Sequence, residues 1–217
     1  MITLINKVKI VVFDLLFPRE RSVREFSASK IIESAKRPKD WDEKDIVALF
    51  DYKDPLIKTA IWEMKYKNNE KAIETLAEIA HAEILNYLSD WTLFENFTDP
   101  ILIPVPLSKE KLEKRGYNQT EILAKEIVKL DNAVNLICFP DIVIKSKDTE
   151  DQSSLKTRAR RLKNLNGCFE VISPEKVKGR NIIIIDDVTT TGATLKEMKK
   201  VLKKSGAGKV KAFAVAH

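Results

Sequence analysis

Four consecutive isoleucines, Ile182 to Ile185, constrain the fold of this chain more than any other feature of its sequence. A strand that is apolar at every position has to be covered on both faces, which is typical of the centre of a parallel sheet. Two carboxylates, Asp186 and Asp187, follow directly. Because ligands of open α/β sheets bind at the carboxyl ends of the strands, the sequence predicts a binding site at this point.

The segment after the two aspartates is rich in hydroxyl groups and leads into a helix that we expect to begin near Leu195. Hydroxyls and amide N–H groups at a helix amino terminus bind phosphate, and a glycine lets the backbone approach it closely. The predicted phosphate-binding residues are Thr189, Thr190, Thr191, Gly192, Ala193 and Thr194. The simpler alternative is an acidic turn and a threonine–glycine cap that only begin the helix.

The aspartate pair has a different expected partner, because two carboxylates repel the phosphate that the neighbouring loop attracts. Ribose hydroxyls donate hydrogen bonds to carboxylates, and Mg²⁺ is bound through one or two carboxylates and several waters. We therefore expect Asp186 and Asp187 to hold a ribose or a Mg²⁺ ion, the latter directly or through water. The combination predicts a phosphorylated ribose as the ligand.

The rest of the chain alternates between strand-like and helix-like segments. Short apolar runs predict strands, and apolar residues at helical spacing predict helices. The expected strands are 46–50, 101–105, 142–144, 168–172, 182–185 and 210–215, and the expected helices are 54–66, 71–87 and 120–130, with a polar loop at 107–119. This alternation predicts an α/β fold with a mostly parallel central sheet flanked by helices.

Two segments stand apart from that pattern. Residues 1–45 are patchy and charged, and we expect a small N-terminal appendage there, followed by one domain at 46–217. Residues 145–166 are rich in charge and predict either a mobile flap or a surface helix. Asp14 lies in a run similar to the nucleophile strand of aspartate phosphatases, but the second aspartate of that chemistry is missing, so we interpret Asp14 as structural.

Three motifs occur in the order that a known family has them. The first is the PVPL run at 104–107, followed by Lys111 and by RGYNQ at 115–119. The last is the segment 186–194 described above. Between them lies a spaced pattern made of Gln152, Leu155, Arg161, Asn164, Gly167 and Phe169. The chain resembles the ComF-type competence proteins, which belong to the type I phosphoribosyltransferase superfamily, from about Ile46 to its end.

The resemblance implies roles for individual residues. It implies that the loop 186–194 binds phosphoribosyl pyrophosphate, with Asp186 and Asp187 as catalytic residues and Mg²⁺ as cofactor. It makes the loop after the second strand a pyrophosphate loop, in which we expect Lys111 and Arg115 to bind, because a guanidinium grips phosphate oxygens two at a time. Four further residues are candidates for contacting the ligand from this loop or for supporting the loop structurally: Ser108, Asn118, Gln119 and Lys65. Asn118 and Gln119 have the alternative of fastening the loop to the sheet.

One departure from the family is clear in the sequence. Family members commonly carry an N-terminal zinc ribbon with CxxC pairs, whereas this chain has only Cys138 and Cys168. Their spacing supports neither a disulfide framework nor a zinc site, so we expect two buried, reduced thiols and no zinc.

Two functions from different classes follow from the resemblance. The first is a phosphoribosyltransferase that acts on an unidentified nitrogen acceptor, with a link to DNA uptake. The second is a non-catalytic module that binds nucleotide or single-stranded DNA. The second is favoured modestly by the net charge of +6 and by a basic cluster at Arg158, Arg160, Arg161 and Lys163, although a solvated helix face accounts for that cluster better than a DNA groove does. The two carboxylates favour the first, because phosphate binding alone gains nothing from them.

Further expectations concern the setting of the protein. No apolar stretch reaches the roughly 18 residues needed to cross a bilayer, so we expect a cytoplasmic protein without membrane insertion. His81 and His217 are the only histidines, and we expect neither to be catalytic. The sequence leaves the acceptor and the oligomeric state open.

Overall fold

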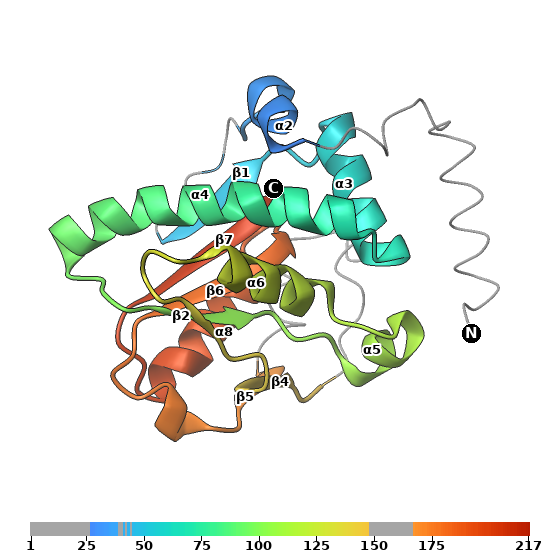
Figure 1. Ribbon diagram of the computed structural model, residues 1–217. Coiled ribbons are helices and arrows are strands. Elements are labelled where there is room, and N and C mark those ends of the chain that lie inside the picture. Colours follow the sequence, from blue (N-terminus) through green and yellow to red (C-terminus); the bar gives the residue numbers. More distant parts are fainter. Residues whose placement is uncertain (1–26, 39–40, 42, 44, 148–166) are drawn as a thin grey trace.

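A five-stranded parallel sheet forms the centre of the computed structural model, which describes residues 27–38, 41, 43, 45–147 and 167–217. The strand order is β1-β7-β6-β2-β3 (Figure 1). The strands of this sheet are β1 (Ile46–Phe50), β2 (Ile101–Pro104), β3 (Ile137–Cys138), β6 (Ile182–Val188) and β7 (Val210–Ala216). The predicted α/β fold with a parallel central sheet flanked by helices is confirmed.

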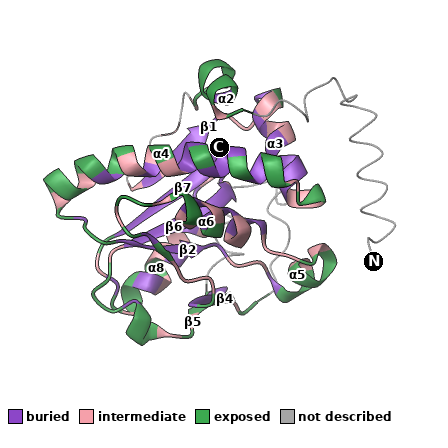
Figure 2. Ribbon diagram, in the orientation of Figure 1, coloured by how far each residue is buried: buried purple, intermediate pink, exposed green. Residues whose placement is uncertain are grey.

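The isoleucine strand β6 lies in the middle of the sheet, parallel to β2 on one side and to β7 on the other. Its side chains alternate between the two faces. Ile183 and Ile185 are buried in one hydrophobic cluster, and Ile182 and Ile184 in another. Figure 2 shows the buried sheet between more exposed helix surfaces. The prediction that this strand is covered on both faces is therefore confirmed.

Different helices cover the two faces. The first cluster joins the sheet to α2 (Ala28–Ser34), α3 (Pro55–Lys67), α4 (Glu70–Glu95) and α6 (Gln119–Leu130). The second cluster joins it to α8 (Ala193–Lys204), where Leu195, Met198 and Leu202 are buried. Asp54 caps α3 by accepting a hydrogen bond from the N–H of Leu56, ahead of a proline at the first helical position.

The structure corrects several boundaries. Helix α4 runs to Glu95 rather than to 87, and ends at Asn96 in the left-handed conformation. The expected polar loop contains a short helix, α5 (Lys109–Arg115). Strand β6 continues through Val188, so Asp186 and Asp187 lie inside the strand instead of after it.

Two predicted strands belong outside the central sheet. β4 (Val143–Lys145) and β5 (Phe169–Val171) pair with each other in antiparallel fashion and form a separate two-stranded sheet, followed by the 3₁₀ turn η2 (Pro174–Lys176). Strand β3, the parallel neighbour of β2, was not predicted from the sequence, because only two of its residues pair.

The described part of the N-terminal appendage packs on the main core. Ile31 of α2 is 1% exposed and lies in the same cluster as α4. The domain boundary at 45/46 stays a prediction. Asp14, the residues from Gln152 to Asn164 in the spaced family pattern, the basic cluster and most of the predicted flap lie outside the described residues. Among the described helices, none combines the length and apolar character needed to traverse a lipid bilayer.

Candidate functional site

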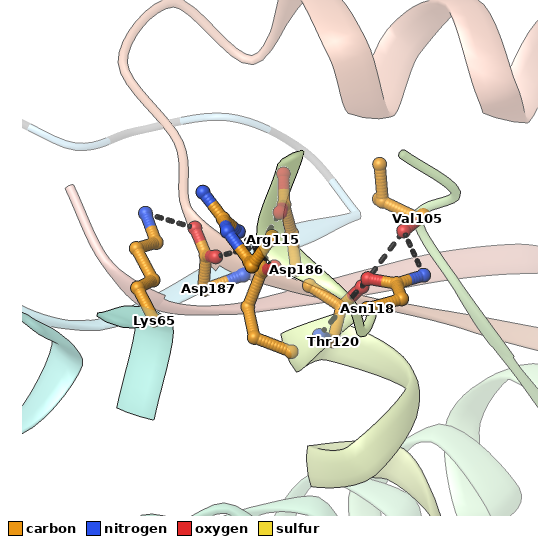
Figure 3. Close-up of polar contacts among 8 residues, drawn as sticks. Lys65, Val105, Arg115, Asn118, Thr120, Asp186 and Asp187 are labelled. Carbon is orange, nitrogen blue, oxygen red and sulfur yellow. Dashed lines mark hydrogen bonds and ion pairs between the residues drawn. The ribbon is translucent and has the colours of Figure 1, made fainter. Parts of the chain in front are cut away.

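The two aspartates of β6 lie where three segments of the chain converge (Figure 3). One segment is the end of β6 itself. The second is the connection from β2 through α5 to α6, which carries Arg115 and Gln119. The third is the last turn of α3, which carries Lys65. The parallel sheet places the ends of β2 and β6 side by side, with Pro104 opposite Ile185.

Asp187 is held on both carboxylate oxygens. The Lys65 ammonium lies 2.8 Å from Oδ1, and Gln119 Nε2 donates to Oδ2 at 2.5 Å. The Asp187 side chain is 6% exposed and that of Lys65 is 18% exposed. Burial by itself lowers the pKa of the Lys65 ammonium, but the Asp187 carboxylate outweighs burial and raises this pKa above its ordinary value.

Asp186 has a different environment from its neighbour. Its Oδ1 accepts a hydrogen bond from the backbone N–H of Asp187 at 2.8 Å. Burial raises the pKa of the Asp186 carboxyl to about 8, with a further contribution from the Asp187 charge and against the opposing effects of the Asp187 N–H and Lys65. The raised pKa shifts Asp186 toward its protonated form, so the site carries less negative charge than two ordinary carboxylates would give it.

The segment after β6 turns directly into the amino terminus of α8. Gly192 is the N-cap of α8 and has a φ of +69°, a backbone conformation that residues with a side chain rarely adopt. A Cβ atom built on Gly192 would lie 3.4 Å from side-chain atoms of Ile46 and Trp41. Ala193, the first residue of α8, is buried. The loop thus turns tightly from the strand into the helix.

Thr191 provides the clearest sign of a ligand in this loop. Its hydroxyl oxygen is buried and has no hydrogen-bond partner among the described residues. A buried polar atom without a partner costs about 1–3 kcal/mol, so a water, an ion or a ligand group is expected to bind the Thr191 hydroxyl. Of the other predicted phosphate-binding residues, Thr189 donates its N–H to Ala216 O at 2.9 Å, while Thr190 is exposed and Thr194 half-buried on α8. A phosphate oxygen is a suitable partner for the Thr191 hydroxyl.

The connection from β2 to α6 is built by its own side chains. Ser108 caps α5, with its hydroxyl 3.5 Å from the N–H of Lys111. Gly116 ends α5 in the left-handed conformation at φ +85°. Asn118 caps α6 by accepting from Thr120 N–H at 3.2 Å, and donates to Val105 O at 3.1 Å. Asn118 therefore fastens this connection to the end of β2.

Arg115 and Gln119 lie closer to the aspartates. The Arg115 guanidinium donates to Gln119 Oε1 and lies 5.4 Å from the centre of the Tyr66 ring. Lys65, Asp187, Gln119 and Arg115 thus form one continuous polar chain across the site. Ser108 and Asn118 are not part of this chain, and Lys111 lies half-buried on α5.

Two aromatic residues near the site were not among the predicted site residues. The Tyr117 hydroxyl donates to Met64 O at 3.0 Å and accepts from Asn68 N–H at 3.1 Å, which ties the RGYNQ segment to the end of α3. The tyrosine inside that motif was the available signal. The Trp41 ring lies 4.3 Å from that of His217, whose Nδ1 is 3.3 Å from Thr189 O. No pattern in the sequence pointed to that contact.

Other parts of the described chain offer less. His81 pairs with Asp131 at 3.4 Å on the α4 side of the molecule. Cys168 is buried and Cys138 half-buried, both as free thiols, and burial raises the pKa of Cys138 to about 11. Within the described ranges no group of three metal-binding side chains occurs. A cavity of about 420 Å³ lies between β1 and α4, lined in part by Trp41, Tyr87 and Trp91, and none of the predicted site residues lines it.

Comparisons with known proteins identify the family of the chain. A family described as "Phosphoribosyl transferase domain" matches residues 112–217. Competence protein F of Haemophilus influenzae is 30% identical over 182 residues, which is 83% of this chain and 75% of the relative. The chain belongs to the ComF-type competence protein family. The family resemblance predicted from the motifs is thereby confirmed.

Two further relatives belong to the same group. DNA utilization protein YhgH of Escherichia coli is 28% identical and covers 82% of this chain and 74% of the relative. Competence protein ComFC of Bacillus subtilis is 33% identical and covers 69% of this chain and 61% of the relative. This ComF-type chain thus contains a phosphoribosyltransferase-like domain, and its relatives' names link them to competence and DNA utilization.

Proposed function

We propose that this ComF-type protein binds phosphoribosyl pyrophosphate together with Mg²⁺ and transfers the phosphoribosyl group to a nitrogen acceptor. The observation that carries the proposal is the buried Thr191 hydroxyl, which has no hydrogen-bond partner among the described residues. It lies in the turn that joins α8 to the end of β6, the strand that holds the two buried carboxyl groups. A helix amino terminus with hydroxyl donors suits a phosphate, whereas carboxylates suit hydroxyl donors or a cation. A phosphorylated ribose carries both kinds of group.

The roles of the residues follow from their places. Thr191 and the backbone N–H groups around Gly192 would bind the 5-phosphate. Asp186 and Asp187 would accept hydrogen bonds from the ribose hydroxyls and orient the ring. The donor set also fits Mg²⁺, which when bound would neutralise charge on the pyrophosphate. Arg115 has guanidinium N–H groups beyond the one that holds Gln119, and with Lys111 it would face the pyrophosphate.

The reaction would replace one bond at ribose carbon 1 with another. The bond to the pyrophosphate oxygen breaks as positive charge develops on the ring, and the acceptor nitrogen forms the new bond and loses a proton. The residues contribute by positioning and by electrostatic stabilisation rather than by covalent catalysis. The carboxylates on the ribose hydroxyls would stabilise the developing positive charge.

The alternative of a nucleotide- or single-stranded-DNA-binding module rests on a basic cluster that lies outside the described residues. We favour the transferase, because phosphate binding alone gains nothing from the buried pair Asp186 and Asp187. Binding of single-stranded DNA is therefore measured beside that of phosphoribosyl pyrophosphate in the experiment that follows.

Isothermal titration of phosphoribosyl pyrophosphate in the presence of Mg²⁺ tests the proposal. We expect saturable binding to the wild type, binding that is weakened strongly in Asp187→Asn, and unchanged binding in Asp141→Asn, a control at an exposed aspartate. A folded wild type that binds single-stranded DNA but no phosphoribosyl pyrophosphate would overturn the proposal. Release of pyrophosphate in a panel of nitrogen acceptors then identifies the second substrate.

A further inference from the structure

Lys65 reaches the site from a part of the chain that carries neither of the ligand loops. It lies in the last turn of α3, and its ammonium is 2.8 Å from Asp187 Oδ1. In Figure 3 it points at Asp187 from the side opposite the α6 residues. The inference below concerns this lysine and rests on the proposed function.

The carboxylate of Asp187 has no oxygen left unpaired in the ligand-free site. Lys65 holds Oδ1 and Gln119 holds Oδ2. A ribose hydroxyl or a hydrated divalent cation needs the same oxygens. An ammonium and a divalent cation at one carboxylate repel each other at such short range, which favours departure of Lys65 when a cation binds.

The lysine is able to leave without a movement of the helix. Tyr117 fixes the backbone at the end of α3 through Met64 O and Asn68 N–H. The Lys65 side chain is 18% exposed, and the lysine stem is flexible. A new position of the ammonium therefore requires only rotation of side-chain bonds.

We propose that Lys65 is a charge-exchange residue of this site. Its ammonium neutralises Asp187 while the site is empty, and it moves to a phosphate group of the ligand when the ribose hydroxyls take that carboxylate. Lys65 thus keeps free cations from Asp187 and adds a positive charge for the anionic ligand. The two effects have opposite signs for the two kinds of ligand.

Binding of Mn²⁺ alone and of phosphoribosyl pyrophosphate with Mg²⁺, measured on the same variants, tests this exchange. In Lys65→Met we expect Mn²⁺ to bind about tenfold more tightly and phosphoribosyl pyrophosphate about tenfold more weakly, as for the gain or loss of one charged contact. Lys65→Arg keeps the charge and should restore most of the phosphoribosyl pyrophosphate affinity. Lys67→Met is the matched control, since Lys67 lies on the same turn but pairs with Glu63 at 2.8 Å.

If Lys65 served folding alone, Lys65→Met would weaken the binding of both ligands or of neither. Either result would overturn the inference. A wild type that binds no phosphoribosyl pyrophosphate sinks the proposed function, whereas unchanged Mn²⁺ affinity in Lys65→Met sinks the exchange by itself.

A measurement on the wild type covers the case in which Lys65→Met does not fold. Acetylation of Lys65 by acetic anhydride, followed by mass spectrometry, should become faster with Mn²⁺ alone and slower with phosphoribosyl pyrophosphate and Mg²⁺. Equal rates under the three conditions would contradict the exchange.

Discussion

The two connections that follow β6 and β2 meet at the same edge of the sheet, yet their polar side chains are used differently. After β6, the buried Thr191 hydroxyl has no partner among the described residues. After β2, Asn118 and Thr120 spend their polar groups on caps and on Val105 O, and Gln119 and Arg115 bind along the polar chain. The first connection therefore has a hydroxyl group available to a ligand, whereas most polar groups of the second connection form hydrogen bonds within the protein. The motif residues of this site therefore divide into those that we expect to bind the ligand and those that stabilise the loop.

The largest effect is expected at Asp187, where both connections meet. Asp187→Asn removes the charge that Lys65 and a ligand share, and hydrogen bonds to charged groups contribute about 1.5–3 kcal/mol each. We expect phosphoribosyl pyrophosphate affinity to fall by about 100-fold in calorimetric titration. A fall in affinity of less than threefold would show that Asp187 stabilises the protein rather than binds the ligand.

The pH dependence of stability tests whether Asp186 is protonated in the ligand-free protein. Its pKa is about 8 in the folded chain against 3.8 for the unperturbed group, so between these values the folded state binds a proton that the unfolded state lacks. Stability from this group then falls as pH rises from about 4 to about 8, by about 1.4 kcal/mol per pH unit at most. Asp186→Asn lacks this proton, so we expect its stability to rise relative to the wild type over that range. Parallel curves in urea denaturation would refute a raised pKa.

Two threonines with buried hydroxyl groups give the sharpest contrast between the connections. Thr120 donates to Val105 O at 2.7 Å, whereas Thr191 has no such bond among the described residues. Thr120→Val should lower the free energy of unfolding by about 1–2 kcal/mol, and Thr191→Val should leave it unchanged or raise it. Phosphoribosyl pyrophosphate affinity should fall about tenfold only in Thr191→Val. The opposite assignment of the two losses would break the comparison.

The smallest effects are expected at the helix caps of the second connection. Asn118→Ala removes the cap of α6 and the bond to Val105 O, and loss of a cap costs about 1 kcal/mol. Ser108→Ala removes a longer contact of 3.5 Å at a short helix, so we expect a loss of a few tenths of a kcal/mol. Thermal unfolding of both variants measures this order. A reversed order would place more of the loop's stability in α5.

Local patterns were sufficient to predict the elements that carry the site. The isoleucines of β6 and the hydroxyl-rich turn before α8 have their character in the sequence itself, so both could be assigned to a strand end and a helix start. Helix α4 was predicted too short, because its last turns are held by tertiary contacts such as that of Trp91 with Phe97 and Phe213. The pairing of β4 with β5 outside the central sheet likewise depends on contacts between distant segments.

The motifs named the residues that meet around Asp187, but they did not predict which of these residues pair with one another. The motifs brought forward Asp187, Gln119, Arg115 and Lys65, but the ion pair between Lys65 and Asp187 joins helix α3 to strand β6 and leaves no local pattern. The raised pKa of Asp186 depends in the same way on how deeply the strand end is buried.

A crystal structure of the protein with phosphoribosyl pyrophosphate and Mg²⁺ tests the central claim most directly. We predict a phosphate oxygen within hydrogen-bond distance of Thr191 Oγ1, ribose hydroxyls on Asp186 and Asp187, and Lys65 Nζ displaced from Asp187 Oδ1. A ligand bound elsewhere, with the Thr191 hydroxyl still unpartnered and the Lys65–Asp187 pair intact, would contradict the account.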